Sequence, residues 1–157
     1  MVNPKFSRWM YRDGRPNWLA RAWNAIYAMV FGLGIGPSSW STLSVRGRKS
    51  GKMIHFPVVV GEVEGRRYLV SMLGERAAWV KNVRAAGGAA VLRHGRAVDV
   101  TLVETAPAER LAPLRDYVRR APGGRPHLGL KVDASDAEII AIMTDIPVFE
   151  IRPRAQG

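Results

Sequence analysis

Short runs of apolar and β-branched residues, separated by turn residues, extend from Thr42 onward and predict strands. The expected strands cover residues 54–64, 68–71, 89–92, 97–104 and 146–151. Gly65-Arg66-Arg67 is expected to turn the chain between the first two, and His94-Gly95-Arg96 between the next two. Because these strands are joined by turns rather than by repeated βαβ crossovers, the pattern favours a small, mostly antiparallel barrel.

Apolar residues at helical spacing predict helices over residues 77–86, 107–120 and 133–144. Trp79, Val80 and Val83 share one side of the first, which the pair Gly87-Gly88 is expected to end. Pro107 opens the second, which carries Leu111, Leu114 and Val118 at helical spacing. The pattern therefore places one short helix among the strands and other helices outside them.

A basic and aromatic stretch at residues 5–16 precedes an apolar run at residues 18–35, which is expected to be helical. Arg21 and Asn24 interrupt this run, and residues 36–40 make a poor cleavage site, so a signal peptide is rejected. A membrane-spanning helix needs about 20 apolar residues and is rejected as well. Two interpretations stay open: a helix that packs on the barrel, and a helix that lies on an anionic membrane surface.

The length and composition narrow the function. A chain of 157 residues suits one domain, here residues 41–157, after an N-terminal segment of residues 1–40. Cysteine is absent, which excludes disulfides, thiolate catalysis and cysteine-ligated metals, and the three histidines lack metal-site spacing, so no metal is expected. The net charge of +11 favours an anionic partner. Nucleic acid is not expected, because no nucleic-acid-binding motif is present.

The candidate chemistry concentrates at Arg46-Gly47-Arg48-Lys49-Ser50-Gly51-Lys52. Its glycines allow a tight backbone turn, while its cations and Ser50 supply donors for an anion. The spacing does not match a P-loop. The glycines at residues 32–36 follow a predicted helix rather than a strand, so they are not a dinucleotide-binding fingerprint. By itself such a stretch is also typical of a solvated turn.

Taken in order, several segments resemble the deazaflavin (coenzyme F420)-dependent nitroreductase and quinone reductase family. The resemblance covers roughly residues 41–153 and rests on the following segments: residues 42–52, Pro57-Val58, Tyr68-Leu69-Val70-Ser71, Gly74, Trp79-Val80-Lys81-Asn82-Val83 and Ile146-Pro147-Val148-Phe149. It implies an α+β split β-barrel of the FMN-binding, pyridoxamine-oxidase-like type. It also implies coenzyme F420 as the cofactor, with FMN as the less favoured choice.

The resemblance assigns roles to particular residues. Arg48, Lys49, Ser50 and Gly51 match the family's grip on the cofactor's phosphate and acidic tail. Ser71, Met72, Leu73 and Gly74 match the segment along the deazaflavin ring, and Trp79 and Asn82 match the Trp-x-x-Asn element that closes the site. The cofactor supplies the hydride chemistry, so the protein's task is binding and orientation.

Three further residues are candidates for the substrate side. Tyr27 and His127 are expected to line it, and the Tyr117 hydroxyl is a candidate catalytic group that could hydrogen-bond a quinone oxygen. Residues 122–124, near Tyr117, are interpreted as a lid. Each of the three side chains is also explained as an ordinary half-buried polar residue.

Two departures from the family pattern favour its membrane-associated, lipid-binding branch. Met53-Ile54 stand where a second basic residue is common, and the loop from Ser71 to Trp79 is short. We therefore expect a cytoplasmic reductase of apolar quinone-like or unsaturated substrates, peripheral on the inner face of the membrane. The alternative is a fatty-acid or lipid carrier on the same barrel. A homodimer is a further expectation, since barrels of this type often pair.

Overall fold

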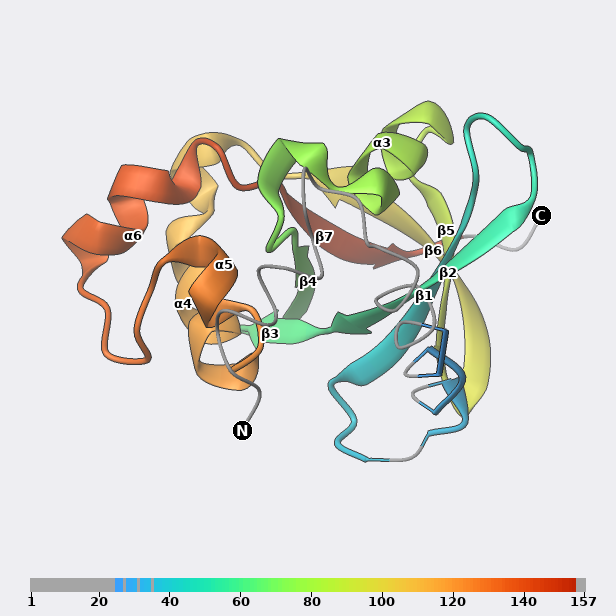
Figure 1. Ribbon diagram of the computed structural model, residues 1–157, viewed down its shortest axis with the longest axis horizontal. Coiled ribbons are helices and arrows are strands. Elements are labelled where there is room, and N and C mark those ends of the chain that lie inside the picture. The colour runs from blue at the N-terminus through green and yellow to red at the C-terminus, as the bar shows by residue number, and fades with distance from the viewer. Residues whose placement is uncertain (1–24, 27, 31, 35, 155–157) are drawn as a thin grey trace.

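The computed structural model describes residues 25–26, 28–30, 32–34 and 36–154 of the chain. Seven strands form one antiparallel sheet in the order β2-β1-β5-β6-β7-β4-β3 (Figure 1). They are β1 (Trp40–Arg46), β2 (Met53–Val59), β3 (Gly61–Val63), β4 (Arg66–Val70), β5 (Ala89–His94), β6 (Arg96–Glu104) and β7 (Val148–Pro153). The helices are α3 (Ala78–Ala85), α4 (Leu111–Arg120), α5 (Arg125–Leu128) and α6 (Asp136–Met143), with short 3-10 helices η2 (Gly74–Arg76) and η3 (Pro107–Glu109).

The expected strand over residues 54–64 is two strands, and the prediction of one was wrong. The chain breaks at Val60, after which β3 pairs with β4, whereas β2 pairs with β1 at the opposite end of the sheet order. β2 and β3 are consecutive in the chain but are the two edge strands of the sheet. The sheet must therefore curl, so that its two edges come close together. The result is a half-barrel, and Pro57, which has no N–H donor, lies on its edge strand β2.

Two hairpins organise the rest of the sheet. The β5–β6 hairpin turns at Gly95, which has a φ of 74°, as predicted. The β3–β4 hairpin turns at Glu64 and Gly65, with φ of 50° and 77°, so Arg66 and Arg67 already belong to β4 instead of the predicted turn. Two successive positive φ angles match the right-handed twist of the flanking strands.

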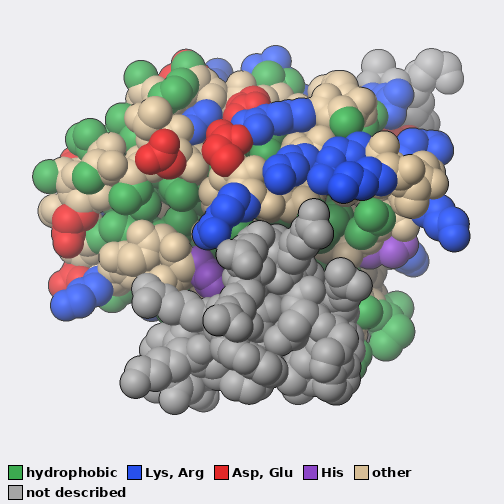
Figure 2. Space-filling model, turned by 45° about the horizontal axis from the view of Figure 1, so that its top comes forward, with side chains coloured by type: hydrophobic (Ala, Val, Ile, Leu, Met, Phe, Trp, Pro, Cys, Tyr) green, Lys and Arg blue, Asp and Glu red, His purple; other side chains and the backbone are tan. Residues whose placement is uncertain are grey.

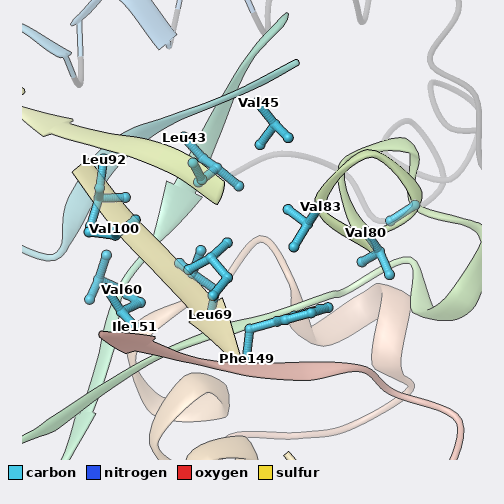
Figure 3. Packing of buried hydrophobic residues seen from close by; sticks show 13 residues of the cluster. Leu43, Val45, Val60, Leu69, Val80, Val83, Leu92, Val100, Phe149 and Ile151 are labelled. Atoms are coloured by element: carbon cyan, nitrogen blue, oxygen red, sulfur yellow. The ribbon is translucent and has the colours of Figure 1, made fainter. Parts of the chain in front are cut away.

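A barrel core fills the concave side of the sheet and is covered by α3 (Figure 3). Val80 and Val83 point from α3 toward the strands, as the spacing of apolar residues in 77–86 predicts. The helix ends at Ala85, and Gly87 follows with a φ of 64°. The strand residues in this core are Leu43, Val45, Leu69, Ala90, Leu92, Val100, Leu102, Phe149 and Ile151, and Val60 joins them from the break between β2 and β3.

A second, helical core lies between the other face of β4 and β7 and the helices α4, α5 and α6. Alternation along the strands separates the two cores: Leu69 and Phe149 face the barrel core, whereas Val70 and Val148 face the helical core. Leu114 and Ile139 supply the helical side of the contact. One pair of strands therefore supports both halves of the molecule.

The helix limits differ from the sequence predictions for local reasons. Residues 107–109 form η3, so α4 begins only at Leu111. Helix α6 begins at Asp136 rather than at residue 133, because Ser135 forms a capping box with Glu138. Helix α5 was not predicted, and β7 extends to Pro153, beyond the predicted end at residue 151.

The described part of the N-terminal segment is helical at residues 25–26, 28–30 and 32 and lies against β1 and β5. Thr42 donates a side-chain hydrogen bond to the carbonyl oxygen of Ala28, and Gly95 donates its N–H to Gly32 at 2.9 Å. Ile26, Met29 and Leu33 are 50%, 63% and 60% exposed. Among the described residues, no helix has the length and apolar character that crossing a membrane requires.

Candidate functional site

The basic segment predicted as an anion grip is the turn between β1 and β2, residues 47–52. Its own backbone closes it: Gly47 donates to the Lys52 carbonyl at 2.8 Å, and Gly51 donates to the Gly47 carbonyl at 2.9 Å. Gly51 has a φ of 71°, which glycine adopts without a steric penalty. Arg48, Lys49 and the other turn side chains are exposed, apart from the buried Gly47. The turn is therefore preformed and presents cations to solvent.

Asn82 fastens this basic turn to α3. Its side-chain oxygen accepts from the Arg48 backbone N–H at 3.2 Å and from the Arg48 guanidinium at 2.9 Å. The side chain is 1% exposed, so these bonds replace contacts with water that it has lost. The Trp-x-x-Asn and Gly-Arg-Lys-Ser-Gly elements are thus in direct contact, through two residues that are 34 positions apart in sequence.

The segment after β4 forms a tight turn held by Ser71. The Ser71 hydroxyl donates to the Gly74 carbonyl at 2.8 Å, and Gly74 donates its N–H back to the Ser71 carbonyl at 3.0 Å. Ser71 is fully buried, whereas Met72 and Leu73 are half-buried at the surface of the turn. The hydroxyl thus supports the turn, while Leu73 packs partly on the barrel core and Met72 partly on the helical core.

An open cleft of about 600 Å³ lies beside this turn. Three segments line it: the β4–α3 connection, the start of α5, and the loop between α6 and β7. The lining residues are Met72, Leu73, Gly74, Glu75, Arg76, Pro126, His127, Asp145 and Ile146. The cleft therefore brings three predicted ring-contact residues together with the predicted substrate residue His127. The charged residues Glu75, Arg76 and Asp145 were not predicted, because no local motif marks them.

Trp79 is the second residue of α3. It is half-buried, and its ring packs on Phe149 with the centroids 5.5 Å apart and the planes tilted by 57°. Such a tilted aromatic pair is favourable beyond the area that it buries. Trp79 thus contributes to the barrel core and keeps part of its surface exposed.

Tyr117 lies in the helical core. It is 6% exposed, and burial raises the pKa of its hydroxyl, so the group stays protonated. Gly124, in the predicted lid, packs against its ring so closely that a Cβ at Gly124 would collide with the phenol. The catalytic role of Tyr117 stays a prediction that its burial disfavours, and Tyr27 falls outside the described residues.

Glu75, which lines the cleft, belongs to a group of alternating carboxylates and arginines. Arg84 contacts Glu75 at 2.6 Å and Glu104 at 2.6 Å. The hydrogen bond from Arg84 lowers the pKa of Glu75 and keeps its carboxylate charged. Figure 2, in which the top of Figure 1 faces the viewer, shows Lys and Arg side chains gathered beside several carboxylates. Within the described residues, no cluster of His, Asp or Glu suited to a metal ion occurs.

Comparison with known proteins places these features in a family. A family model described as F420H(2)-dependent quinone reductase matches residues 22–129, which is more than half of the chain. This match includes both the basic turn and the Trp-x-x-Asn element, and it ends before Asp145. No curated protein matches the sequence.

Solved structures share the fold at low sequence identity. A chain described as a domain-swapped dimer is 20% identical, with a TM-score of 0.53 over 86% of this chain and 97% of that one. An F420-H2-dependent reductase, FDR-A, is 23% identical, with a TM-score of 0.51 over 73% of this chain and 95% of that one. A pyridoxamine 5′-phosphate oxidase-like protein of Listeria innocua is 9% identical, with a TM-score of 0.50 over 74% and 85%. The predicted split β-barrel is confirmed.

Proposed function

Because the chain belongs to the F420H(2)-dependent quinone reductase family, we propose that it transfers a hydride from reduced coenzyme F420 to an apolar quinone-like or unsaturated substrate. The observation that carries this proposal is the bond between Asn82 and Arg48. It joins the basic turn to α3, the helix whose preceding 3-10 turn lines the cleft. An extended molecule with one anionic end and one aromatic end suits that arrangement.

The residues present fit a phosphorylated, carboxylated cofactor. Arg48, Lys49, Ser50 and Gly51 would hold its anionic end, because a preformed turn with exposed cations pays little to order itself around an anion. Met72, Leu73 and Gly74 would lie along the deazaflavin ring. When bound, the cofactor supplies the hydride, and the chain supplies binding, orientation and exclusion of water. FMN is the less favoured cofactor.

The substrate would enter the cleft from the side of His127. An imidazole there can donate a hydrogen bond to the oxygen on which negative charge develops. The apolar side chains of Met72, Leu73 and Ile146 suit an apolar ring.

A fluorescence titration tests the cofactor site. The purified protein is titrated with F420 while Trp emission is followed, beside the Lys49→Ala variant and a matched control, Lys131→Ala, in which an exposed lysine outside both regions is removed. We expect saturable quenching, an affinity about 10-fold weaker in Lys49→Ala, and a native affinity in Lys131→Ala. Anaerobic oxidation of F420H2 by menadione then tests turnover. A native protein that neither binds F420 nor turns over would refute the proposal.

Membrane proximity is the second part of the proposal. Ile26, Met29 and Leu33 present an exposed apolar face beside a chain with a net charge of +11, which suits an anionic bilayer surface. This face and a cytoplasmic, peripheral location are also consistent with apolar substrates. The opposite side of the same segment, at Ala28 and Gly32, packs on the sheet, so packing and membrane contact are compatible.

Vesicle flotation tests this part. The native protein is mixed with vesicles rich in phosphatidylglycerol, beside a Met29→Glu, Leu33→Glu variant. The control, Val132→Glu with Ile140→Glu, alters somewhat less exposed apolar residues elsewhere. Flotation is expected to be lost in the first variant and kept in the control. Equal flotation of both variants would exclude this face as the contact. Binding of fatty acid without binding of F420 would favour the lipid-carrier alternative.

A further inference from the structure

Arg110 lies behind the cleft, between η3 and α4, with only 4% of its surface exposed. One terminal nitrogen, Nη1, donates to three carbonyl oxygens: Met143 at the end of α6, at 3.1 Å, and Thr144 and Ile146 in the loop between α6 and β7, each at 3.0 Å. The other, Nη2, donates to the Thr105 carbonyl at 3.2 Å. A planar guanidinium with converging donors therefore fixes the path of that loop.

The same guanidinium begins a chain of ionic contacts. Its Nη2 lies 3.7 Å from the Glu104 carboxylate, at the end of β6. Glu104 is bound in turn by Arg84, with Nε donating at 3.0 Å and Nη2 at 2.6 Å. Arg84 also donates to both carboxylate oxygens of Glu75, at 2.6 and 3.2 Å. Four charged side chains of alternating sign thus connect four separate elements.

This network of ionic contacts reaches both walls of the cleft. Glu75 belongs to η2 on one side, and the loop held by Arg110 carries Asp145 and Ile146 on the other. The two walls also touch at Gly74, where a Cβ would lie 3.2 Å from the Asp145 carbonyl oxygen. Glu104 lies between the two arginines, so it fixes the position of one wall relative to the other.

A purely fold-stabilising role would leave part of this arrangement unexplained. Satisfying the loop carbonyls requires Arg110 alone, whereas the contacts continue outward through Arg84 to the exposed Glu75. The outer contacts fix the side chain of Glu75, which lines the cleft, by two hydrogen bonds from Arg84.

We propose that Glu104 and Arg110 are positioning residues of the cleft, which hold its two walls in the spacing that orients the substrate against the cofactor ring. This inference rests on the proposed function. Misplacing bound reactants by about 1 Å can lower the rate about 100-fold, so a small change in spacing is expected to act on kcat. Binding of the cofactor's anionic end, at the basic turn, is expected to be unaffected.

The test uses Glu104→Gln, which keeps the side-chain shape and removes the charge, against Glu150→Gln on β7. Glu150 also pairs with one arginine, Arg152, but it does not line the cleft. The first readout is amide hydrogen exchange of the cofactor-free protein. Exchange at residues 72–76 and 144–146 is expected to rise together in Glu104→Gln and to stay native in Glu150→Gln.

The second readout is steady-state kinetics with F420H2 and menadione. For Glu104→Gln we expect kcat to fall about 10-fold while the Kd of F420 stays within about twofold of native. Arg84→Gln, a change at the exposed end of the network, is expected to give a similar loss, and the double variant no additional one. This surface variant also keeps the inference testable if Glu104→Gln does not fold.

The outcomes separate the two proposals. Native exchange and native kcat in both Glu104→Gln and Arg84→Gln, in a protein that turns over, would overturn the positioning role alone. Equal losses in Glu150→Gln would overturn it as well. A native protein that does not bind F420 or turn over would refute the proposed function and this inference with it.

Discussion

The basic turn and the cleft are built in opposite ways. The turn is one continuous segment, residues 47–52, closed by its own backbone and anchored from outside by Asn82. The cleft gathers residues from three distant parts of the chain and is held by side chains that do not line it, above all Arg110 and Glu104. A local turn can therefore tolerate changes elsewhere, whereas the cleft depends on contacts throughout the fold.

The two regions are also proposed to have different functions: the turn binds the cofactor, and the cleft orients the reactants. Exposed cations on a closed turn recognise charge, which requires little precision and responds to salt. Orientation of a hydride donor against an acceptor requires exact spacing, and a network of several elements can provide it. We therefore expect changes in the turn to act on cofactor affinity and changes around the cleft to act on kcat.

The largest effect is expected at the contact between the cleft walls. Gly74→Ala places a Cβ at a φ of 65° and 3.2 Å from the Asp145 carbonyl, so both strain and crowding act. Gly87→Ala is the matched control, because its φ is 64° and nothing lies within 4 Å of its Cβ position. Both variants should lose about 1 kcal/mol of unfolding free energy from strain. Gly74→Ala should lose more, and its kcat should fall about 10-fold.

Denaturant unfolding and menadione reduction measure these two effects. The comparison between turn and cleft predicts that F420 affinity falls less in Gly74→Ala than in Lys49→Ala, because Gly74→Ala alters one contact with the ring and leaves the basic turn unchanged. Equal stability and equal kcat in the two glycine variants would contradict a specific contact between the walls.

A smaller effect is expected at the anchor of the turn. Asn82→Ala leaves the Arg48 backbone N–H and guanidinium without their acceptor, at a cost of about 1–2 kcal/mol in unfolding free energy. Cofactor affinity should weaken about 10-fold, because the turn is less preorganised, while kcat at saturating cofactor stays near native. Titration and kinetics measure the two quantities separately. A fall in kcat at unchanged F420 affinity would contradict the proposal that the turn acts on cofactor affinity and the cleft on kcat.

The smallest effect is the pH dependence of the Glu75–Arg84 pair. Arg84 lowers the pKa of Glu75 in the folded state. The pair therefore stabilises the fold fully at pH values above the pKa that Glu75 has in the unfolded chain. That stability is lost as the pH falls below about 4 and through the lowered folded-state pKa. Native protein and Glu75→Gln should therefore differ in stability at neutral pH and converge in acid. Urea unfolding at several pH values measures this, and a gap that widens in acid would contradict it.

The sequence predicted the elements that have local patterns. The helix over residues 77–86 and the β5–β6 hairpin followed from apolar spacing and from glycines at the positions of positive φ. The split of residues 54–64 into β2 and β3 was not predicted, because an apolar run carries no mark of where a sheet curls. Helix α5 has only four residues, too few for periodicity to be visible.

In the candidate site, too, only features with a local sequence pattern were predicted. The cations of the turn and the Trp-x-x-Asn element could be identified from residue types and spacing, since each is contiguous. Asn82 was expected to contact the cofactor, yet its side-chain oxygen holds Arg48. Tyr117 was expected at the substrate side, and the structure buries it under Gly124. Burial depends on which segments pack together, and the local pattern of a single sequence does not indicate this.

The sequence alone thus determined the charge, the helices and hairpins that have local patterns, the basic turn and the resemblance to the family. These properties depend on residues close together in the chain, where backbone geometry and side-chain spacing act directly. Only the tertiary structure decided the curl of the sheet, the cleft and the chain of contacts from Arg110 to Glu75. Those depend on residues brought together by packing, because a contact between distant segments is fixed by the whole core that lies between them.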